Sequence, residues 1–416
     1  LTPDLVRGSE LAERARNAAQ SPETQRLLDE KITEFETAIV LAAGVKVDAL
    51  IETETLVPGS AATVAVRLFM ADDSPARVLS ARVNVPENWT VAASQRQELA
   101  NEAGNRRQDS AVEEAYFLVQ VPNWAGITQP YWLELPREAA AYDWSEAGSE
   151  KSLAFAAPIL TATAVLEIAG REISVTREVE YRQLDRIRGE VRRRIDVVPK
   201  VSVEPATDLM VVPVSTSSEP IELLLTVRNN SADSVSGTAQ FSLPPGWVLE
   251  PSFIEFSLEP APATSTFSYQ VTMPDSLQAG EYQLSGSAAI EGTVYRQAMQ
   301  EIAYPHISTH RTYAQASTEI EVVDVCVADV NVGYLMGSGD VVPESLRRLG
   351  VSVSLLSDSE LTTGDLSQFD VIVVGIRASQ TRAAYVANNQ RLLSYTEKGG
   401  TLIVQYQQPD FVEKNL

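Results

Sequence analysis

Between Val45 and Ala303 apolar and polar residues repeatedly alternate, a period of two that β-strands with one buried face require. The runs ATVAVRLFM, ARVNVP, ATAVLEIAG and REISVTREVEY fall between Val45 and Arg182. A second set, with IELLLTVRNNS, TSTFSYQVTMP and GEYQLSGSAAIEG, falls between Val197 and Ala303. Turn residues separate these runs, as is typical of antiparallel sandwiches. The pattern predicts two consecutive immunoglobulin-like β-sandwiches.

The periodicity is different on both sides of these runs. From Leu5 to about Leu50 apolar residues recur at spacings of three and four, which predicts a helical hairpin. Ser21 and Pro22 are a suitable N-cap and first-turn proline for its second helix.

The last hundred residues alternate predicted strands and helices. Apolar positions within Ile320 to Leu335 predict the first strand, and VSVSLLS, DVIVVG and TLIVQYQ predict three more. Nearly all-apolar strands that alternate with helices predict a parallel sheet covered on both faces. Since only about four strands are present, we expect an incomplete α/β domain.

The chain of 416 residues is therefore expected to be multi-domain. The predicted parts are a helical segment (1–44), a first β-sandwich (45–196), a second β-sandwich (197–303), a polar linker (304–319) and an incomplete α/β domain (320–416).

Charge and cysteine content limit the classes of partner. The formal net charge of −23 disfavours binding to nucleic acid or to an anionic membrane, because a phosphate backbone would repel the chain. No apolar run approaches the roughly 20 residues that span a bilayer. Cys326 is the single cysteine, so an intrachain disulfide is impossible.

The residues that usually carry catalysis are sparse. The two histidines, His306 and His310, both lie in the predicted linker, where Pro305 opposes the helix that would bring them together. Cys326 falls within a predicted central strand, with the character of a small core residue. No nucleophile elbow follows TLIVQYQ. We expect no catalytic residue, no metal ligand and no cofactor site in this chain.

Two groups of residues are candidates for ligand binding. Aromatic residues concentrate in one part of the first sandwich, where Trp124, Trp132 and Trp144 could stack on sugar rings or could fill a core or an interdomain contact. The strand-to-helix loop Gly337, Ser338 and Gly339 could offer amides to an anion, although a tight turn capped by Asp340 explains it as well. The arginine-rich run RIRGEVRRR predicts a solvated strand or a join to an acidic neighbour.

Several segments together resemble a known arrangement. They are ITQPYWLELPRE, LDRIRGEVRRRIDVVPKVSV, the linker sequence YPHI, GYLMGSGDVVPESLRRLGVSVSLLSD and FDVIVVGIRASQTRAAYVANNQRLLSYTEKGGTLIVQY. In this order they resemble the region downstream of the catalytic domain in large bacterial LmbE-like, or PIG-L-type, N-acetylglucosaminyl deacetylases. The second sandwich, with PPGWVLEP, is similar to a module next to carbohydrate-binding domains. The terminal part resembles the first half of a class I amidotransferase-like or ThuA-like domain.

The resemblance implies a zinc-dependent deacetylase domain preceding this chain, with a His-Pro-Asp-Asp fingerprint that is absent here. No family metal ligand can be transferred to any position, so zinc would belong to the missing domain alone. The implied role is a non-catalytic accessory region of an exported bacterial enzyme, which orients its own deacetylase domain and binds glycan. The alternative is a stand-alone carbohydrate-binding or scaffold protein without enzymatic activity. The sequence leaves the oligomeric state open.

Overall fold

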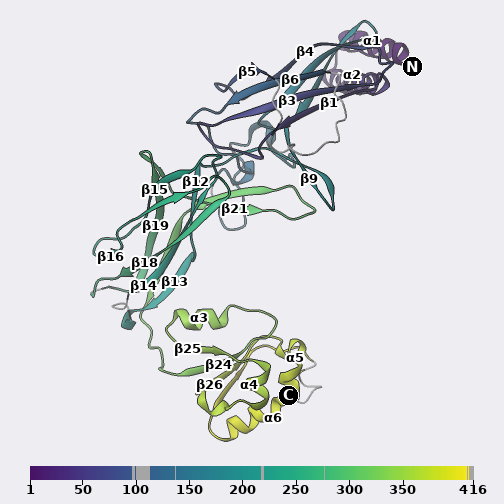
Figure 1. Cartoon of the computed structure of the whole chain (residues 1–416). Coiled ribbons are helices and arrows are strands. Elements are labelled where there is room, and N and C mark those ends of the chain that lie inside the picture. Colours follow the sequence, from purple (N-terminus) through teal and green to yellow (C-terminus); the bar gives the residue numbers. More distant parts are fainter. Residues whose placement is uncertain are drawn as a thin grey trace.

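The structure is a computed structural model, and it describes residues 1–95, 99, 113–135, 137–216, 220–275, 277–409 and 411. Most of the regular structure is β, arranged as two sandwiches in series (Figure 1). A helical hairpin lies at the N-terminal end and a small α/β unit at the other end of the elongated molecule (Figure 1).

The N-terminal hairpin consists of α1 (Thr2–Ala18) and α2 (Pro22–Ala42), as the sequence predicts. Both helices have a proline in their first turn, where its missing N–H costs no hydrogen bond. Arg171 of the first sandwich pairs with Glu13 of α1 at 2.5 Å and with Glu36 of α2 at 3.1 Å. This pairing attaches the helices to the sandwich.

The first sandwich has a six-stranded and a three-stranded sheet. The larger sheet has the order β10 (Gly189–Arg193), β9 (Glu180–Asp185), β1 (Val45–Ile51), β3 (Ala61–Met70), β6 (Glu113–Gln120) and β5 (Thr90–Ser94). The smaller sheet has the order β4 (Ala76–Asn84), β7 (Thr161–Ile168) and β8 (Arg171–Glu178). Alternate residues of both sheets form one apolar core, which also takes in Ile39 and Val40 of α2.

The second sandwich is assembled from a four-stranded and a six-stranded sheet. One sheet contains β12 (Val201–Pro205), β14 (Ile221–Asn229), β18 (Ala263–Thr272) and β16 (Val248–Glu250). The other contains β13 (Leu209–Pro213), β23 (Ser317–Val323), β19 (Gly280–Ile290), β15 (Val235–Ser242) and β17 (Ile254–Leu258), with β20 (Thr293–Tyr295) beside β19. Tyr269 is fully buried between the sheets, and its hydroxyl donates to the Ala239 carbonyl at 2.8 Å.

Two small elements lie where the sandwiches meet, a region that we call the joint. β2 (Thr55–Leu56) pairs with β11 (Asp196–Val197), and β21 (Gln297–Ile302) pairs with β22 (His310–Gln315). Val57, Val198 and Met299 form a separate apolar cluster there. The joint thus has its own small core.

The prediction of a linker at residues 304–319 is wrong. The chain forms β22 and begins β23 within this segment, and only Tyr304 to Thr309 make the turn of the hairpin. Arg311, Ala316 and Thr318 of this segment are buried, which a solvated linker would not show.

The predicted start of the α/β part at Ile320 is also wrong. Ile320 and Val322 belong to β23, which pairs in parallel with β13 and antiparallel with β19. Cys326 is exposed in the following segment, so it is not a core residue of a central strand.

The α/β unit has a parallel four-stranded sheet in the order β25 (Ser352–Leu355), β24 (Asn331–Leu335), β26 (Val371–Val374) and β27 (Thr401–Val404). Its helices are α3 (Val342–Arg348), α4 (Asp358–Thr363), α5 (Ala378–Thr381) and α6 (Ala383–Glu397). Leu361 of α4 and Leu392 of α6 pack with Ile372 of the sheet in one apolar core. The alternation of apolar strands with helices predicted this arrangement.

Candidate functional site

A pocket of about 260 Å³ lies at the joint, and we call it the joint pocket. Three of its walls come from the first sandwich, in the segments 127–134, 150–159 and 194–196. The fourth comes from the β21–β22 hairpin, in the segment 308–311. Two sequence-distant units therefore meet around one cavity.

The three predicted sugar-stacking tryptophans have different positions. Trp132, half-buried in a short 3-10 helix, lines the joint pocket. Trp144 does not line it and packs edge-on against Tyr131, with ring centroids 6.0 Å apart. Trp124 is 66% exposed in the turn after β6, outside the pocket. Of these three tryptophans, Trp132 is the one that lines the joint pocket.

The rings of Phe155 and His310 lie beside Trp132 in the pocket wall. Phe155 stacks on His310 with centroids 5.7 Å apart and an interplanar angle of 15°. Trp132 lies 6.5 Å from His310 at a tilt of 52°. The Arg194 guanidinium lies 5.5 Å from the centre of the Phe155 ring, a cation–π distance. His310 therefore belongs to an aromatic wall, and no metal role is needed to explain its position.

Charged residues also line the joint pocket. Arg194 is paired with Glu178 at 2.8 Å and donates to the Ala156 carbonyl at 2.8 Å. Glu150 accepts a hydrogen bond from the Ala157 amide at 2.7 Å, which orders the segment that carries Phe155. Glu134 is exposed at the rim.

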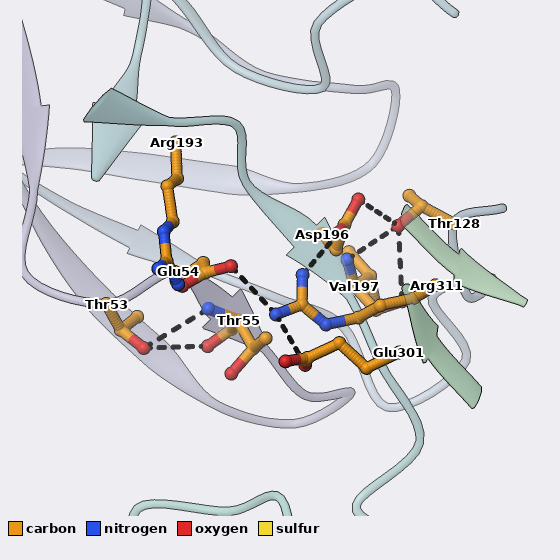
Figure 2. A network of polar contacts seen from close by, with 9 residues as sticks. All are labelled: Thr53, Glu54, Thr55, Thr128, Arg193, Asp196, Val197, Glu301 and Arg311. Atoms are coloured by element: carbon orange, nitrogen blue, oxygen red, sulfur yellow. Dashed lines mark hydrogen bonds and ion pairs between the residues drawn. The ribbon is translucent and has the colours of Figure 1, made fainter. Parts of the chain in front are cut away.

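Arg311 joins the two sandwiches next to this pocket (Figure 2). Its side chain is 5% exposed and forms ion pairs with Asp196 at 2.6 Å, Glu54 at 2.8 Å and Glu301 at 3.1 Å. Arg193 approaches the other Glu54 oxygen at 2.7 Å. Burial disfavours the charged guanidinium, but the hydrogen bonds that it donates to Glu54 and Asp196 and the attraction of these carboxylates outweigh burial and raise the pKa of Arg311.

Thr128 connects this charge cluster to the pocket wall (Figure 2). Its hydroxyl donates to Asp196 at 3.2 Å and accepts from the Val197 amide at 3.0 Å. The Thr128 amide donates to the Val197 carbonyl at 2.9 Å. The segment that leads to Trp132 is thus anchored to the same carboxylate that holds Arg311.

The arginine-rich run forms ion pairs with acidic neighbours, as the sequence predicted. Arg192 donates a bidentate pair of hydrogen bonds to the Asp48 carboxylate, with nitrogen–oxygen distances of 2.7 and 3.1 Å. The hydrogen bonds that Arg192 donates to Asp48 outweigh burial and raise the pKa of Arg192. These pairs hold β9 and β10 against β1.

In the candidate anion loop Gly337, Ser338 and Gly339, one of the three backbone amides already has a hydrogen-bond partner. The Ser338 amide donates to the Ile376 carbonyl at 2.9 Å, so it is already occupied. A side-chain carbon on Gly337 would lie 2.0 Å from that carbonyl oxygen, which shows how closely the two strand-exit loops meet. Asp340 accepts from the Tyr334 hydroxyl and from the Val342 amide, which fits the capped turn. Burial and this carboxylate raise the pKa of Tyr334.

Within the described residues, no group of three or more His, Cys, Asp or Glu side chains is placed to hold a metal ion. No helix in the described part of the chain is long and apolar enough to cross a membrane.

Sequence reasoning missed Phe155 and Arg311. Phe155 lies in a segment without strand or helix periodicity, and Arg311 is an isolated basic residue in a polar stretch. Their roles depend on contacts between segments more than a hundred positions apart, for which the sequence contains no local signal.

No protein-family model matches the chain, and no curated protein matches it either. Among solved structures, the Calx CBD1 domain in its apo form matches with 11% identity and a TM-score of 0.18, over 30% of this chain and 98% of that chain. A Salmonella alpha-2-macroglobulin matches with 10% identity and a TM-score of 0.23, over 69% of this chain and 16% of that one. The Yersinia pseudotuberculosis adhesin InvE matches with 11% identity and a TM-score of 0.18, over 71% and 66% of the two chains. At these scores the likenesses support no functional argument.

Proposed function

We propose that this chain is a non-catalytic, saccharide-binding arm, and that the joint pocket is its binding site. The observation that carries the proposal is the position of Trp132, which lines a cavity together with Phe155 and His310. Saccharide rings stack their apolar faces on aromatic rings. Carboxylates at the rim accept hydrogen bonds from the sugar hydroxyls, and guanidinium groups donate hydrogen bonds to them.

A rigid joint supports this role. Arg311, Thr128 and the apolar cluster around Val198 fix the hairpin relative to the first sandwich. Pre-organisation of a site lowers the entropy lost on binding, so a weakly interacting ligand such as a sugar benefits from it.

The proposal extends to the parent protein. By its resemblance, the chain is the accessory region of an exported bacterial PIG-L-type N-deacetylase, and it orients a zinc-bearing catalytic domain that lies outside it. The second sandwich is then the immunoglobulin-like module, and the α/β unit the amidotransferase-like or ThuA-like part. The competing proposal is a stand-alone glycan-binding or scaffold protein.

Binding is tested by titrating the chain with a panel of mono- and oligosaccharides while tryptophan fluorescence and calorimetric heat are recorded. We expect a saturable response that Trp132→Ala abolishes. Trp124→Ala is the matched control, since Trp124 lies outside the pocket and should leave binding unchanged. If no sugar of the panel gave a response, or if both variants lost the response equally, saccharide binding at this site would be contradicted.

The parent-protein proposal needs a separate measurement. We would determine the intact mass of the protein isolated from its source and map its peptides beyond both ends of this sequence. A mass well above 45.3 kDa, with peptides that carry His-Pro-Asp-Asp, would support the deacetylase assignment. A mass equal to that of this chain would favour the stand-alone binding protein.

A further inference from the structure

We infer that the joint pocket selects a saccharide ring that carries a protonated amine; this inference rests on the proposed saccharide-binding function. The first observation is a charge imbalance. Glu134 and Glu150 line the pocket, and neither forms a salt bridge within the described residues. The Glu134 carboxylate is open to a cationic ligand, and so is the second oxygen of Glu150, whose first oxygen accepts from the Ala157 amide.

The basic residues of the lining are already neutralised. Arg194 is paired with Glu178, and Arg311 is surrounded by three carboxylates. Asp196, the third acid of the lining, is one of those three. The charge still available to a ligand is therefore negative, and it would repel an anionic sugar such as a uronic acid.

The aromatic wall favours the same ligand. Trp132 presents a ring whose negative quadrupole attracts a cation. Phe155 is already in use, because it stacks on His310 and carries the Arg194 guanidinium over its ring. A cavity of about 260 Å³ lies below the usual range of about 300–1,000 Å³ for drug-sized ligands, so it suits a single ring. Ring stacking, a neighbouring carboxylate and limited volume together specify a monosaccharide amine.

Glucosamine and glucose separate charge from shape, because they differ only by an ammonium group in place of one hydroxyl. We would titrate both by calorimetry at about pH 7, where a sugar amine is largely protonated. Choline serves as a cation without a sugar ring. The matched variants are Glu134→Gln and Glu150→Gln, each of which removes one charge. Glu150→Gln also keeps a side-chain oxygen that can accept from the Ala157 amide.

We expect glucosamine to bind about 10-fold more tightly than glucose, the size expected of one charge-assisted contact. At least one of the two glutamine variants should reduce this ratio to near unity. Equal binding of the two sugars, both lost in Trp132→Ala, would overturn the amine selectivity and leave saccharide binding intact. If choline bound as tightly as glucosamine, the pocket would recognise a simple cation and not an amino sugar, which would also overturn the inference. Absence of binding by every sugar would contradict the proposed function itself.

Discussion

Arg311 and Glu54 are 257 positions apart in the sequence, and their side chains form an ion pair of 2.8 Å across the joint. One residue belongs to the β21–β22 hairpin and the other directly precedes β2. A contact of such sequence separation fixes the relative placement of the two sandwiches, because it connects them at a second point besides the peptide chain.

Replacement of Arg311 should destabilise the joint. Arg311→Ala leaves Glu54, Asp196 and Glu301 without their shared partner, and loss of one member of a buried ion cluster costs about 3–5 kcal/mol. We expect the lower end, about 3 kcal/mol, because the carboxylates keep partial solvent contact. The free energy of unfolding from urea titration measures it. Arg77→Ala, whose side chain is 68% exposed and pairs with Glu167, is the control and should change stability by less than about 1 kcal/mol. Equal effects in both variants would contradict the role of Arg311.

The contact between the helical hairpin and the first sandwich should weaken in acid. The hydrogen bond from Arg171 lowers the pKa of Glu13, despite an opposing contribution from burial. A lowered folded-state pKa means that the contribution to stability is present above the unfolded-state value of about 4.3 and is lost as pH falls through the folded value. The difference in urea midpoint between the native protein and Glu13→Gln should therefore shrink as pH falls from about 6 to below about 4. Glu10→Gln, an exposed position on the same helix, should show no such trend. A constant difference for Glu13→Gln would refute the linkage.

The thiol of Cys326 should react readily in the folded protein. It is exposed after β23, and thiol reactivity depends on access as well as on the thiolate fraction. We expect a colorimetric disulfide reagent to modify the native chain at a rate within about tenfold of the urea-unfolded chain. Cys326→Ser should give no signal. Strong protection in the folded state would instead place the thiol in a core.

A methyl group on Gly337 should disturb the α/β unit alone. The added carbon would lie 2.0 Å from the Ile376 carbonyl oxygen, and the backbone must shift to accept it. Overpacking of this kind costs about 1–3 kcal/mol. Faster hydrogen exchange of the β24 and β26 amides would report the effect. Gly126→Ala has open space around the new methyl group and should leave these rates unchanged.

Much of the sandwich architecture could be predicted, because alternation is a local property. In β14, Leu223, Leu225 and Val227 point into the core while the intervening residues face outward, as the period of two requires. The helical hairpin and the alternation of strands with helices after Asn331 are local patterns as well.

Strand pairing could not be predicted in the same way. Ile320 and Val322 have the alternation of a strand, but the sequence does not say which sheet receives it, and the apolar run continues to Val327. Their partners lie in β13 and β19, so the boundary after Val323 depends on long-range pairing. The candidate site was likewise predictable only where its signal is local. The aromatic cluster in the sequence indicated Trp132, whereas the roles of Arg311 and Phe155 depend on contacts across the joint.

The joint also determines how the chain should divide on heating. The two sandwiches share an ion cluster and the apolar cluster of Val57, Val198 and Met299, so neither can unfold without exposing surface of the other. The α/β unit is connected through the segment 324–330, and a side-chain hydrogen bond from Arg348 to the Leu209 carbonyl adds a contact with the second sandwich. The first sandwich with its helical hairpin and the second sandwich should therefore unfold as one cooperative unit, and the α/β unit as another. A calorimetric trace should resolve into two transitions. All five tryptophans belong to the sandwiches, so fluorescence should follow only the transition of the joined pair.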